Sequence, residues 1–426
     1  MRVQGTVRPP GDKSISHRAL LVGALARGPS RFSGLLPGED VQSTARVLRQ
    51  LGAEIGPVRD GDVVTVRPHP FRTPVRVLHC GNSGTTARLL LGVLAGHPFA
   101  ARLTGDQSLR RRPMGRVAAP LRAMGARVTD GSGDRLPLTI RGGRLRALDY
   151  TSPVASAQVK SALLLAGFTG NVSVTLREPY RSRDHTERLF LHLGLPLREA
   201  AGAVIYDAPE RRPRLPGFEL AIPGDASSAA FLVAAAALAE GGELLVENVG
   251  VNPTRTGFLV VLARMGVPVE RLNLRDAGGE PVADLLVRAG AVLGPTEVQA
   301  SEVPALVDEV PILAALASRA SGETIFRAVG ELRVKESDRL ELVARNLRAV
   351  GVRAEVQGDD LHVQGSERPP AGAVETARDH RLAMAFAVLG TLPGAAIRLS
   401  ERRSVAISYP AFFRDLKRIR RARDRD

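Results

Sequence analysis

The sequence is poor in several residue types, and each shortage excludes a class of protein. It contains a single cysteine, Cys80, so no disulfide can form within the chain and a cysteine-rich metal site is excluded. Tryptophan is absent and aromatic residues make up 4% of the chain, which argues against the stacking platforms that bind single-stranded nucleic acid. The longest uncharged apolar run, residues 229–239, predicts a buried helix, because a membrane span needs roughly 20 apolar residues. With no signal-peptide pattern at the N-terminus, we expect a cytoplasmic protein without membrane contact.

Lysine is also scarce. Of the 59 basic residues only four are lysines, and the rest are arginines. Arginine cannot replace lysine where a compact, titratable ammonium group is needed. Lys13, Lys160 and Lys335 are therefore candidate functional residues. Lys417 lies in a basic C-terminal tail and is interpreted as a lysine without a functional role.

The net charge of +15 has two interpretations, a nucleic-acid-binding surface or a site for small anions. No zinc-finger spacing, RNP motif or basic zipper is present. The one local cluster of charge, residues 414–426, has seven basic and three acidic residues and is predicted to be a solvated helix end. The rest of the excess positive charge is dispersed along the chain, which favours a site for small anions over a nucleic-acid-binding surface.

Six segments rich in small apolar residues recur at intervals of roughly 70 residues. They occupy residues 11–26, 81–96, 153–167, 224–239, 307–317 and 377–390. Their apolar residues extend nearly all round the helix, which predicts six helices buried on every side. A second, amphipathic helix type ends in a glycine stop and recurs at residues 45–55, 118–128, 186–197, 257–269 and 344–354, with a sixth copy at 411–419.

Short β-like runs separate these helices, so each unit is predicted to be a compact βαβ-type repeat. The first and fourth units match most closely, "PPGDKS" against "IPGDAS", at an offset of 213 residues. We therefore expect an α/β fold of two domains with three repeats each, buried helices inside and strands outside. The predicted domains are residues 13–224 and residues 1–12 plus 225–426. The chain would cross between them near 11–13 and 223–225, with the functional site in the cleft between them.

The polar cluster that opens each apolar segment supplies the candidate binding residues. Free N–H groups and a partial positive charge make a helix start attractive to anions. Cations and hydroxyls gather in "GDKS", "GNSGTT", "DQSLRRR", "SAQVKS" and "RDHR", and acids in "LVDEVP" and "LRVKESDR". Taken alone, each cluster also fits an ordinary structural role. A serine or Asp308 could cap a helix, and residues 335–339 could form a solvated first helical turn. The P-loop pattern GxxxxGK[ST] is absent. Together the clusters predict a site for two small anions with an acid/base pair between them.

These motifs resemble those of the EPSP synthase family, the 3-phosphoshikimate 1-carboxyvinyltransferases. The resemblance rests on "PGDKSISHRALL", "GNSGTTARLL", "GDQSLRRRPM", "SAQVKSALLLAG", "RDHTE", "PGDASSAAF", "VDEVPILA", "ELRVKESDRL" and "DHRLAMAF", in the family's order across the whole chain. It implies an inside-out α/β barrel of six repeats in two domains. It also implies transfer of the enolpyruvyl group of phosphoenolpyruvate to the 5-hydroxyl of shikimate 3-phosphate, by addition–elimination. No metal or organic cofactor is implied, and we expect a monomer.

The resemblance also implies roles for individual residues. The predicted shikimate 3-phosphate contacts are Lys13, Ser14, Arg18, Ser156, Gln158, Asp308 and Lys335. The predicted phosphoenolpyruvate contacts are Lys13, Asn82, Gly84, Thr85, Arg112, Gln158, Arg339 and Arg381. Asp308 matches the proton acceptor for the 5-hydroxyl and Glu336 the shuttle for the methylene proton, with Lys13 as the third catalytic residue.

Three positions depart from the family pattern. Ala157 stands where many members have a serine, Glu331 where many have an asparagine, and "SVAISYP" lacks a lysine that helps to bind phosphoenolpyruvate. Arg183 is a candidate substitute phosphate contact. Two alternatives stay open at this point: a UDP-N-acetylglucosamine enolpyruvyl transferase, and a basic nucleic-acid-binding protein on a related repeat fold. The first is disfavoured because Cys80 precedes "GNSGTT" and Lys13 is followed by Ser14 rather than asparagine.

Overall fold

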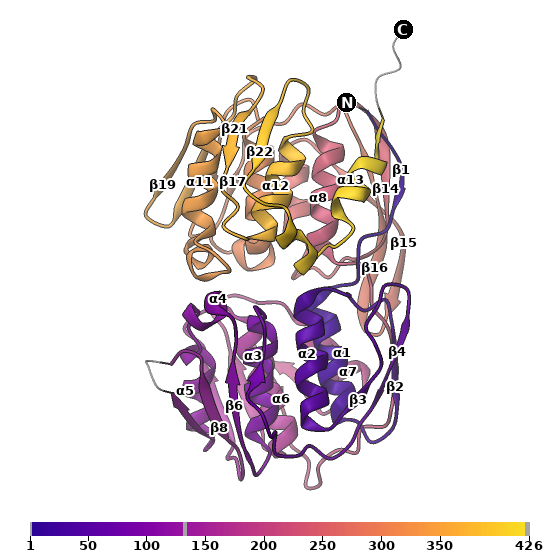
Figure 1. The fold of residues 1–426 in the computed structure, drawn as a ribbon, viewed down its shortest axis with the longest axis vertical. Coiled ribbons are helices and arrows are strands. Elements are labelled where there is room, and N and C mark those ends of the chain that lie inside the picture. Colours follow the sequence, from indigo (N-terminus) through magenta and orange to yellow (C-terminus); the bar gives the residue numbers. More distant parts are fainter. Residues whose placement is uncertain (1, 131–133, 422–426) are drawn as a thin grey trace. The chain divides into compact units, whose positions relative to one another are not determined.

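Six buried helices form the interior of the fold (Figure 1). The computed structural model describes residues 2–130 and 134–421. The buried helices are α1 (Lys13–Leu25), α3 (Gly84–Ala95), α6 (Ala157–Gly170), α8 (Ala226–Ala237), α10 (Val310–Ala317) and α12 (His380–Leu389). All six predicted buried helices are confirmed. Small residues permit close helix packing: at Gly92 in α3 an added Cβ would lie 2.0 Å from the carbonyl oxygen of Ala162 in α6.

The amphipathic helices are confirmed as well. They are α2 (Glu39–Leu51), α5 (Gly115–Ala123), α7 (His185–His192), α9 (Gly257–Arg264), α11 (Arg339–Ala349) and α13 (Phe412–Arg418). The predicted glycine stop is visible after α2, where Gly52 has a φ of 116° that other residues rarely adopt. A short helix, α4 (Gln107–Arg111), was not predicted.

The chain divides into two compact units. Unit 1 consists of the segment up to Pro10, Pro223–Asp276 and the segment from Pro281 onward, and unit 2 of Gly11–Ile222 with Ala277–Glu280. The sequence placed the crossovers at residues 11–13 and 223–225, whereas the division falls after Pro10 and after Ile222. Each unit has one hydrophobic core of its own.

The three sheets of unit 2 share one topology. Their strand orders are β13-β2-β4-β3, β5-β6-β8-β7 and β9-β10-β12-β11. In each sheet the first pair is parallel and the following pairs are antiparallel. The strands are β2 (Ser30–Ser33), β3 (Glu54–Ile55), β4 (Val63–Arg67), β5 (Leu78–His79), β6 (Ala100–Thr104), β7 (Arg127–Asp130), β8 (Leu138–Arg141), β9 (Leu148–Thr151), β10 (Val174–Arg177), β11 (Leu197–Ala200), β12 (Ala203–Tyr206) and β13 (Glu219–Ala221).

Unit 1 repeats this topology with small changes. Its sheets have the orders β23-β1-β14-β16-β15, β17-β18-β20-β19 and β21-β22. The strands are β1 (Arg2–Val7), β14 (Gly241–Gly250), β15 (Val269–Ala277), β16 (Glu280–Arg288), β17 (Glu297–Val298), β18 (Glu323–Phe326), β19 (Ala354–Gln357), β20 (Asp360–Gln364), β21 (Ala371–Val374), β22 (Ala396–Leu399) and β23 (Arg420–Arg421). The parallel pair recurs in all six repeats, which confirms the predicted repeat architecture.

Two strands are exchanged at the crossovers. Strand β1 directly precedes α1 of unit 2 but pairs in parallel with β14 of unit 1. Strand β13 directly precedes α8 of unit 1 but pairs in parallel with β2 of unit 2. The prediction that the N-terminal residues complete a sheet of the C-terminal half is confirmed, and it explains why the polar start of α1 follows a strand from another sheet.

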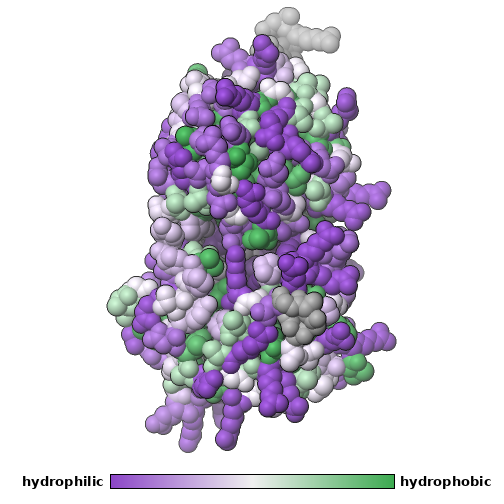
Figure 2. Space-filling view, turned by 90° about the vertical axis from the view of Figure 1, so that its left-hand side faces the viewer, coloured by the Kyte–Doolittle hydropathy of each residue, from purple (hydrophilic) through white to green (hydrophobic). Residues whose placement is uncertain are grey.

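The face drawn in Figure 2 is largely hydrophilic, with apolar residues scattered among the polar ones. Among the described residues, no helix combines the length and apolar character that a membrane crossing requires. Lys417 is exposed on α13, in agreement with its interpretation as a solvated residue. Residues 422–426 of the predicted basic tail lie outside the described residues.

Candidate active site

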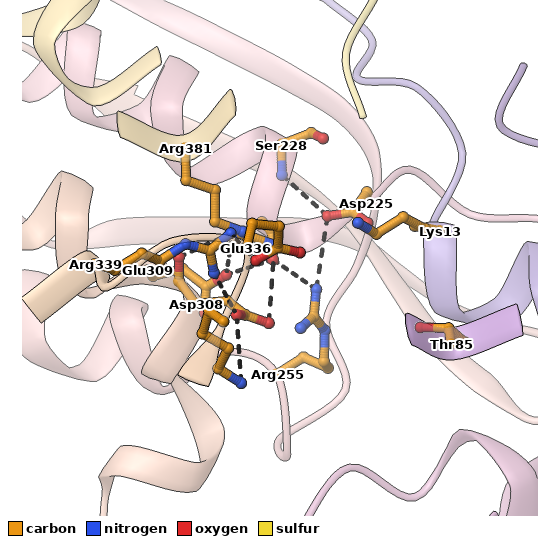
Figure 3. A network of polar contacts seen from close by, with 12 residues as sticks. Lys13, Thr85, Asp225, Ser228, Arg255, Asp308, Glu309, Glu336, Arg339 and Arg381 are labelled. Atoms are coloured by element: carbon orange, nitrogen blue, oxygen red, sulfur yellow. Dashed lines mark hydrogen bonds and ion pairs between the residues drawn. The ribbon is translucent and has the colours of Figure 1, made fainter. Parts of the chain in front are cut away.

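A carboxylate surrounded by cations lies at the centre of the polar cluster of unit 1 (Figure 3). The Asp308 side chain, 13% exposed, accepts a hydrogen bond from Arg339 Nη1 at 3.2 Å. Its Oδ1 is also 3.9 Å from Lys335 Nζ, and its Oδ2 is 3.8 Å from Arg381 Nη2. Three cations therefore lie within 3.9 Å of this one carboxylate. Asp308 lies in a 3-10 turn (Val307–Glu309) and makes no helix-cap hydrogen bond, so the cap interpretation was wrong.

Arg339 is the most enclosed cation of this cluster. Its side chain is 1% exposed, and its Nε donates to Asp379 Oδ2 at 2.7 Å. Burial alone would lower the pKa of Arg339, but Asp379, Glu336 and Asp308 together raise it above the ordinary arginine value. Burial would likewise raise the pKa of Asp379, and the Arg339 guanidinium brings it below the ordinary aspartate value. Both groups are therefore charged at neutral pH.

Glu336 and Lys335 stand beside this pair. The predicted helical turn over residues 335–339 was wrong, because α11 begins at Arg339 and Asp338 is its N-cap. Lys335 and Glu336 precede the helix, so their side chains are not fixed by helical spacing. Glu336 Oε2 lies 2.5 Å from Arg339 Nη2, and its side chain is 21% exposed. Glu336 is thus a partly exposed carboxylate that shares one arginine with Asp308.

Arg381 opens helix α12, and two acidic residues hold its guanidinium. Its Nη1 donates to the backbone oxygen of Asp308 at 2.9 Å and lies 3.4 Å from Glu309 Oε1. Glu309 is fully buried and accepts a short hydrogen bond from the hydroxyl of Ser227. Ser227 accepts in turn from Arg255 Nη2 at 2.7 Å. The structure therefore places Arg339, Arg381 and Asp308 in one network, as the predicted roles require.

Helix α1 carries the first polar cluster of unit 2. Its N-cap is Asp12, which accepts from the backbone N–H of Ile15 at 2.9 Å, so the serine-cap interpretation of this motif was wrong. Lys13 Nζ lies 3.2 Å from Asp40 Oδ2, and its side chain is 17% exposed. Ser14 is half-buried in the same first turn. Burial, with the charges of Lys13 and Arg18, lowers the pKa of His17 well below its ordinary value, so this histidine is neutral.

Arg18 is a buried cation held by neutral oxygens. Its Nε donates to Thr186 Oγ1 at 2.7 Å, its Nη2 to Ser161 Oγ at 2.6 Å and its Nη1 to the backbone oxygen of Ser14 at 2.9 Å. Burial is the main cause that lowers the pKa of Arg18 to about 10, and the positive charge of Arg183 adds to the effect. Two guanidinium groups near each other favour an anion between them.

The helix start at α3 and the arginine-rich stretch before α5 come together. Arg112 is the buried member of the three consecutive arginines and donates from Nη2 to Asn82 Oδ1 at 2.5 Å. Asn82 donates from Nδ2 to Asp106 Oδ2 at 2.6 Å. At Gly84 an added Cβ would lie 2.8 Å from Arg88 Nη1 and 3.5 Å from Arg112 Nη1. Glycine thus leaves room beside two guanidinium groups.

Gln158 connects α6 to α3. Its Nε2 donates to Thr85 Oγ1 at 2.9 Å, and its Oε1 accepts from Arg88 Nη1 at 2.6 Å. Ser156 is the N-cap of α6, as the capping interpretation predicted. Sequence reasoning missed Arg88. The only signal for it was its position two residues after the "GNSGTT" motif.

The structure groups the predicted residues within each unit. In unit 2 the groups are Lys13 with Ser14 and Arg18, Asn82 with Arg112, and Thr85 with Gln158; in unit 1 they are Lys335, Glu336, Arg339, Arg381 and Asp308. Several supporting residues were not predicted as site residues: Asp40, Arg88, Glu178, Ser227, Arg255, Glu309 and Asp379. Arg88, Ser227, Glu309 and Asp379 lie inside the quoted motifs, which do not single them out, whereas Asp40, Glu178 and Arg255 lie outside every quoted motif.

Comparison with known proteins identifies the family. The model of the EPSP synthase family (3-phosphoshikimate 1-carboxyvinyltransferase) matches residues 1–416. The chain belongs to the EPSP synthase family. A relative named 3-phosphoshikimate 1-carboxyvinyltransferase from Thermus thermophilus is 50% identical over 98% of this chain and 96% of its own length. One from Geobacillus kaustophilus is 46% identical over 98% of each chain.

Solved structures of this family agree. The EPSP synthase of Acinetobacter baumannii superimposes with a TM-score of 0.86 at 37% identity, covering 98% of this chain and 96% of the other. The enolpyruvyl transferase NikO from Streptomyces tendae has a TM-score of 0.78 at 20% identity, which shows the shared fold alone, over 98% of this chain and 95% of that one. The predicted family and fold class are confirmed.

Proposed function

We propose that the polar clusters of the two units act on one pair of substrates, phosphoenolpyruvate and shikimate 3-phosphate. The activity follows from the family: the chain is a 3-phosphoshikimate 1-carboxyvinyltransferase, a transferase of aromatic amino acid biosynthesis. The roles of the individual residues, the location of both substrates between the two units, the monomeric state and the cytoplasmic location remain predictions. The observation that best supports the roles is the Asp308 carboxylate facing Lys335, Arg339 and Arg381.

In the first step Asp308 accepts the proton of the 5-hydroxyl while that oxygen attacks C2 of phosphoenolpyruvate. A carboxylate held by three cations is a weak base in the free enzyme. An incoming phosphoenolpyruvate competes for Arg339 and Arg381, because its phosphate and carboxylate match planar guanidinium groups. Loss of these cations to the substrate makes Asp308 more basic when the hydroxyl must be deprotonated.

In the same step the methylene carbon of phosphoenolpyruvate gains a proton and becomes a methyl group. We assign this proton to the acid form of Glu336, whose side chain is 21% exposed and contacts Arg339, and which takes up its proton from solvent before this step. The resulting tetrahedral ketal collapses when Glu336 takes a methyl proton back and the bond between C2 and the phosphate oxygen breaks. The proton from the 5-hydroxyl leaves with phosphate, so atoms and charge balance, and Lys335 neutralises charge beside both carboxylates.

The cations of unit 2 hold the anionic ends of the substrates. We assign Lys13 and Arg112, with Asn82 and Thr85, to phosphoenolpyruvate. Gly84 has no side chain to cover the guanidinium groups of Arg112 and Arg88, which lets the substrate approach them. Fixed donors that already face the leaving phosphate stabilise its developing charge without reorganisation.

A second set in unit 2 holds shikimate 3-phosphate. We assign Ser14, Arg18 and Ser156 to this substrate, with Gln158 reaching both. Arg183, whose charge acts on Arg18, is the candidate extra phosphate contact. Arg183 would replace the phosphate contact of the serine hydroxyl that is missing at Ala157.

One assay tests the function. The purified chain, given phosphoenolpyruvate and shikimate 3-phosphate, is expected to release inorganic phosphate, and shikimate 3-phosphate must be required. Asp308→Ala is expected to lower the rate by about 10²- to 10⁴-fold, the usual contribution of a general base. Phosphate release that is unaffected by shikimate 3-phosphate would contradict the assignment.

A further inference from the structure

Lys160, one of the four lysines, lies in a buried ion-pair triad of unit 2. Its side chain is 3% exposed on helix α6, and its Nζ lies 2.9 Å from Glu178 Oε2 and 2.8 Å from Glu187 Oε1. It also donates to the backbone oxygen of Ser182 at 3.3 Å. None of these groups has a role in the reaction as assigned above.

The triad explains why a lysine persists in an arginine-rich chain. Three oxygen atoms converge on one nitrogen, a geometry that suits a compact ammonium with three donors and not a planar guanidinium. Burial alone would lower the pKa of Lys160, but Glu187 and Glu178 raise it above the ordinary lysine value. Lys160 is therefore a permanent counter-ion for two enclosed carboxylates.

Glu178 joins two segments that carry predicted substrate contacts. Its Oε1 accepts the backbone N–H of Ser156 at 2.8 Å, which fixes the start of α6. Both of its oxygens accept from Ser182 Oγ at 2.8 Å, and Oε2 also accepts the Ser182 backbone N–H at 3.4 Å. Ser182 directly precedes Arg183. One carboxylate thus connects the backbone of Ser156 to the loop that holds Arg183.

A second connection lies one residue away from the triad on each helix. Ser161 follows Lys160 on α6, and Thr186 precedes Glu187 on α7. Thr186 Oγ1 donates to Ser161 Oγ at 2.7 Å, and both hydroxyls accept from Arg18. The triad and this hydroxyl pair therefore fix the same two helices at adjacent positions.

We propose that Glu178 is a positioning residue for shikimate 3-phosphate: it holds Ser156 and Arg183 in register around the substrate phosphate, and Lys160 is its counter-ion. This inference rests on the proposed function. The supporting geometry is the set of contacts from one carboxylate, 10% exposed, to both segments. The chemistry requires it as well, because a phosphate bound by groups from separate loops needs those loops preset at a fixed separation.

Glu178→Ala and Glu178→Gln test the proposal together. Alanine removes every contact to Ser156 and Ser182, yet it leaves Lys160 paired one-to-one with Glu187, which spares folding. We expect the KM for shikimate 3-phosphate to rise about tenfold, with kcat and the KM for phosphoenolpyruvate within about twofold of the parent. The amide oxygen of glutamine still accepts the Ser156 N–H, so Glu178→Gln should recover most of the loss.

A purely structural role gives a different pattern. Partial unfolding lowers apparent kcat with the folded fraction and leaves both KM values unchanged, and that result for Glu178→Ala would overturn the proposal. If Glu178→Ala does not fold, Ser182→Ala decides the matter, with an expected rise of about threefold in the same KM; an unchanged KM rejects the proposal.

The parent enzyme and a matched variant complete the experiment. Glu199→Ala removes an exposed carboxylate on β11 that lies 3.1 Å from Arg181, the residue before Ser182. This variant should leave kcat and both KM values unchanged. If the parent chain shows no shikimate 3-phosphate-dependent release of phosphate, the proposed function itself fails. If the parent is active and Glu178→Ala keeps the parent KM, only this inference fails.

Discussion

The arginines assigned to the substrates in the two units are held by different kinds of oxygen. In unit 1, Arg339 and Arg381 contact the carboxylates of Asp379, Asp308 and Glu309. In unit 2, Arg18 donates to two hydroxyls and a backbone carbonyl.

The same contrast extends to Arg112 and Arg88 of unit 2, whereas Lys13 of this unit pairs with the carboxylate of Asp40. Arg112 donates to an asparagine amide oxygen, and Arg88 to a glutamine amide oxygen and the carbonyl of Pro113. Neutral acceptors orient a guanidinium without cancelling its charge, which suits an anion that stays bound. Carboxylate acceptors balance the charge and can also take up protons, which suits unit 1 for the chemical steps.

Removing a carboxylate from unit 1 should have the largest effect on stability. Asp379→Asn leaves the buried Arg339 guanidinium without its fully buried counter-charge, and breaking a buried pair costs about 3–5 kcal/mol of unfolding free energy. Urea unfolding at neutral pH measures this cost. A loss below about 1 kcal/mol would show that the carboxylate is not needed to hold the arginine.

The matched substitution in unit 2 should lower the free energy of unfolding by less than Asp379→Asn does. Thr186→Val removes the hydroxyl that accepts from Arg18 Nε and keeps the side-chain shape. An unsatisfied buried donor costs about 1–3 kcal/mol. The same urea titration applies, and a cost equal to that of Asp379→Asn would erase the distinction between the two units.

The smallest effect concerns acid. The folded pKa of Asp379 is below the ordinary value of 3.8, so its contribution to stability is present above that value. This contribution is lost as pH falls from the ordinary value through the lower folded pKa, because the unfolded chain then binds more protons. Urea midpoints measured at decreasing pH should therefore decline less steeply in Asp379→Asn than in the parent. Thr186→Val should keep the parent slope, since a threonine does not titrate; identical slopes in all three proteins would contradict the account.

Local sequence patterns predicted the framework well. The six buried and six amphipathic helices follow from apolar periodicity and glycine stops within each segment, which a single stretch of sequence displays. The exchange of β1 was predicted because the "PGD" turns at residues 10–12 and 223–225 align at a fixed offset. Family motifs supplied the candidate residues, Arg112 among them, and the structure shows Arg112 to be the buried one of the three consecutive arginines.

The supporting contacts could not be predicted because they are non-local. Asp379 and Arg339 are 40 residues apart, and Arg18 and Thr186 are 168 apart. The sequence shows that each of these residues is polar, but it does not show which residues are partners. The helix start at Arg339 was misjudged for a related reason: five charged or polar residues in a row fit both a turn and a first helical turn, and the Asp338 cap decided between them.

The central claim is that the proton-transferring carboxylates lie in unit 1 whereas Arg18 of unit 2 holds shikimate 3-phosphate, and one measurement tests it directly. In heavy water, addition–elimination places deuterium in the vinyl group of the product. Glu336→Gln is expected to lower product formation by about 10²-fold or more, the usual loss when a proton-transfer group is removed. Arg18→Lys in unit 2 should raise the KM for shikimate 3-phosphate and keep the parent ratio of deuterium incorporated to phosphate released. A Glu336→Gln enzyme that forms deuterated product at the parent rate would contradict the account.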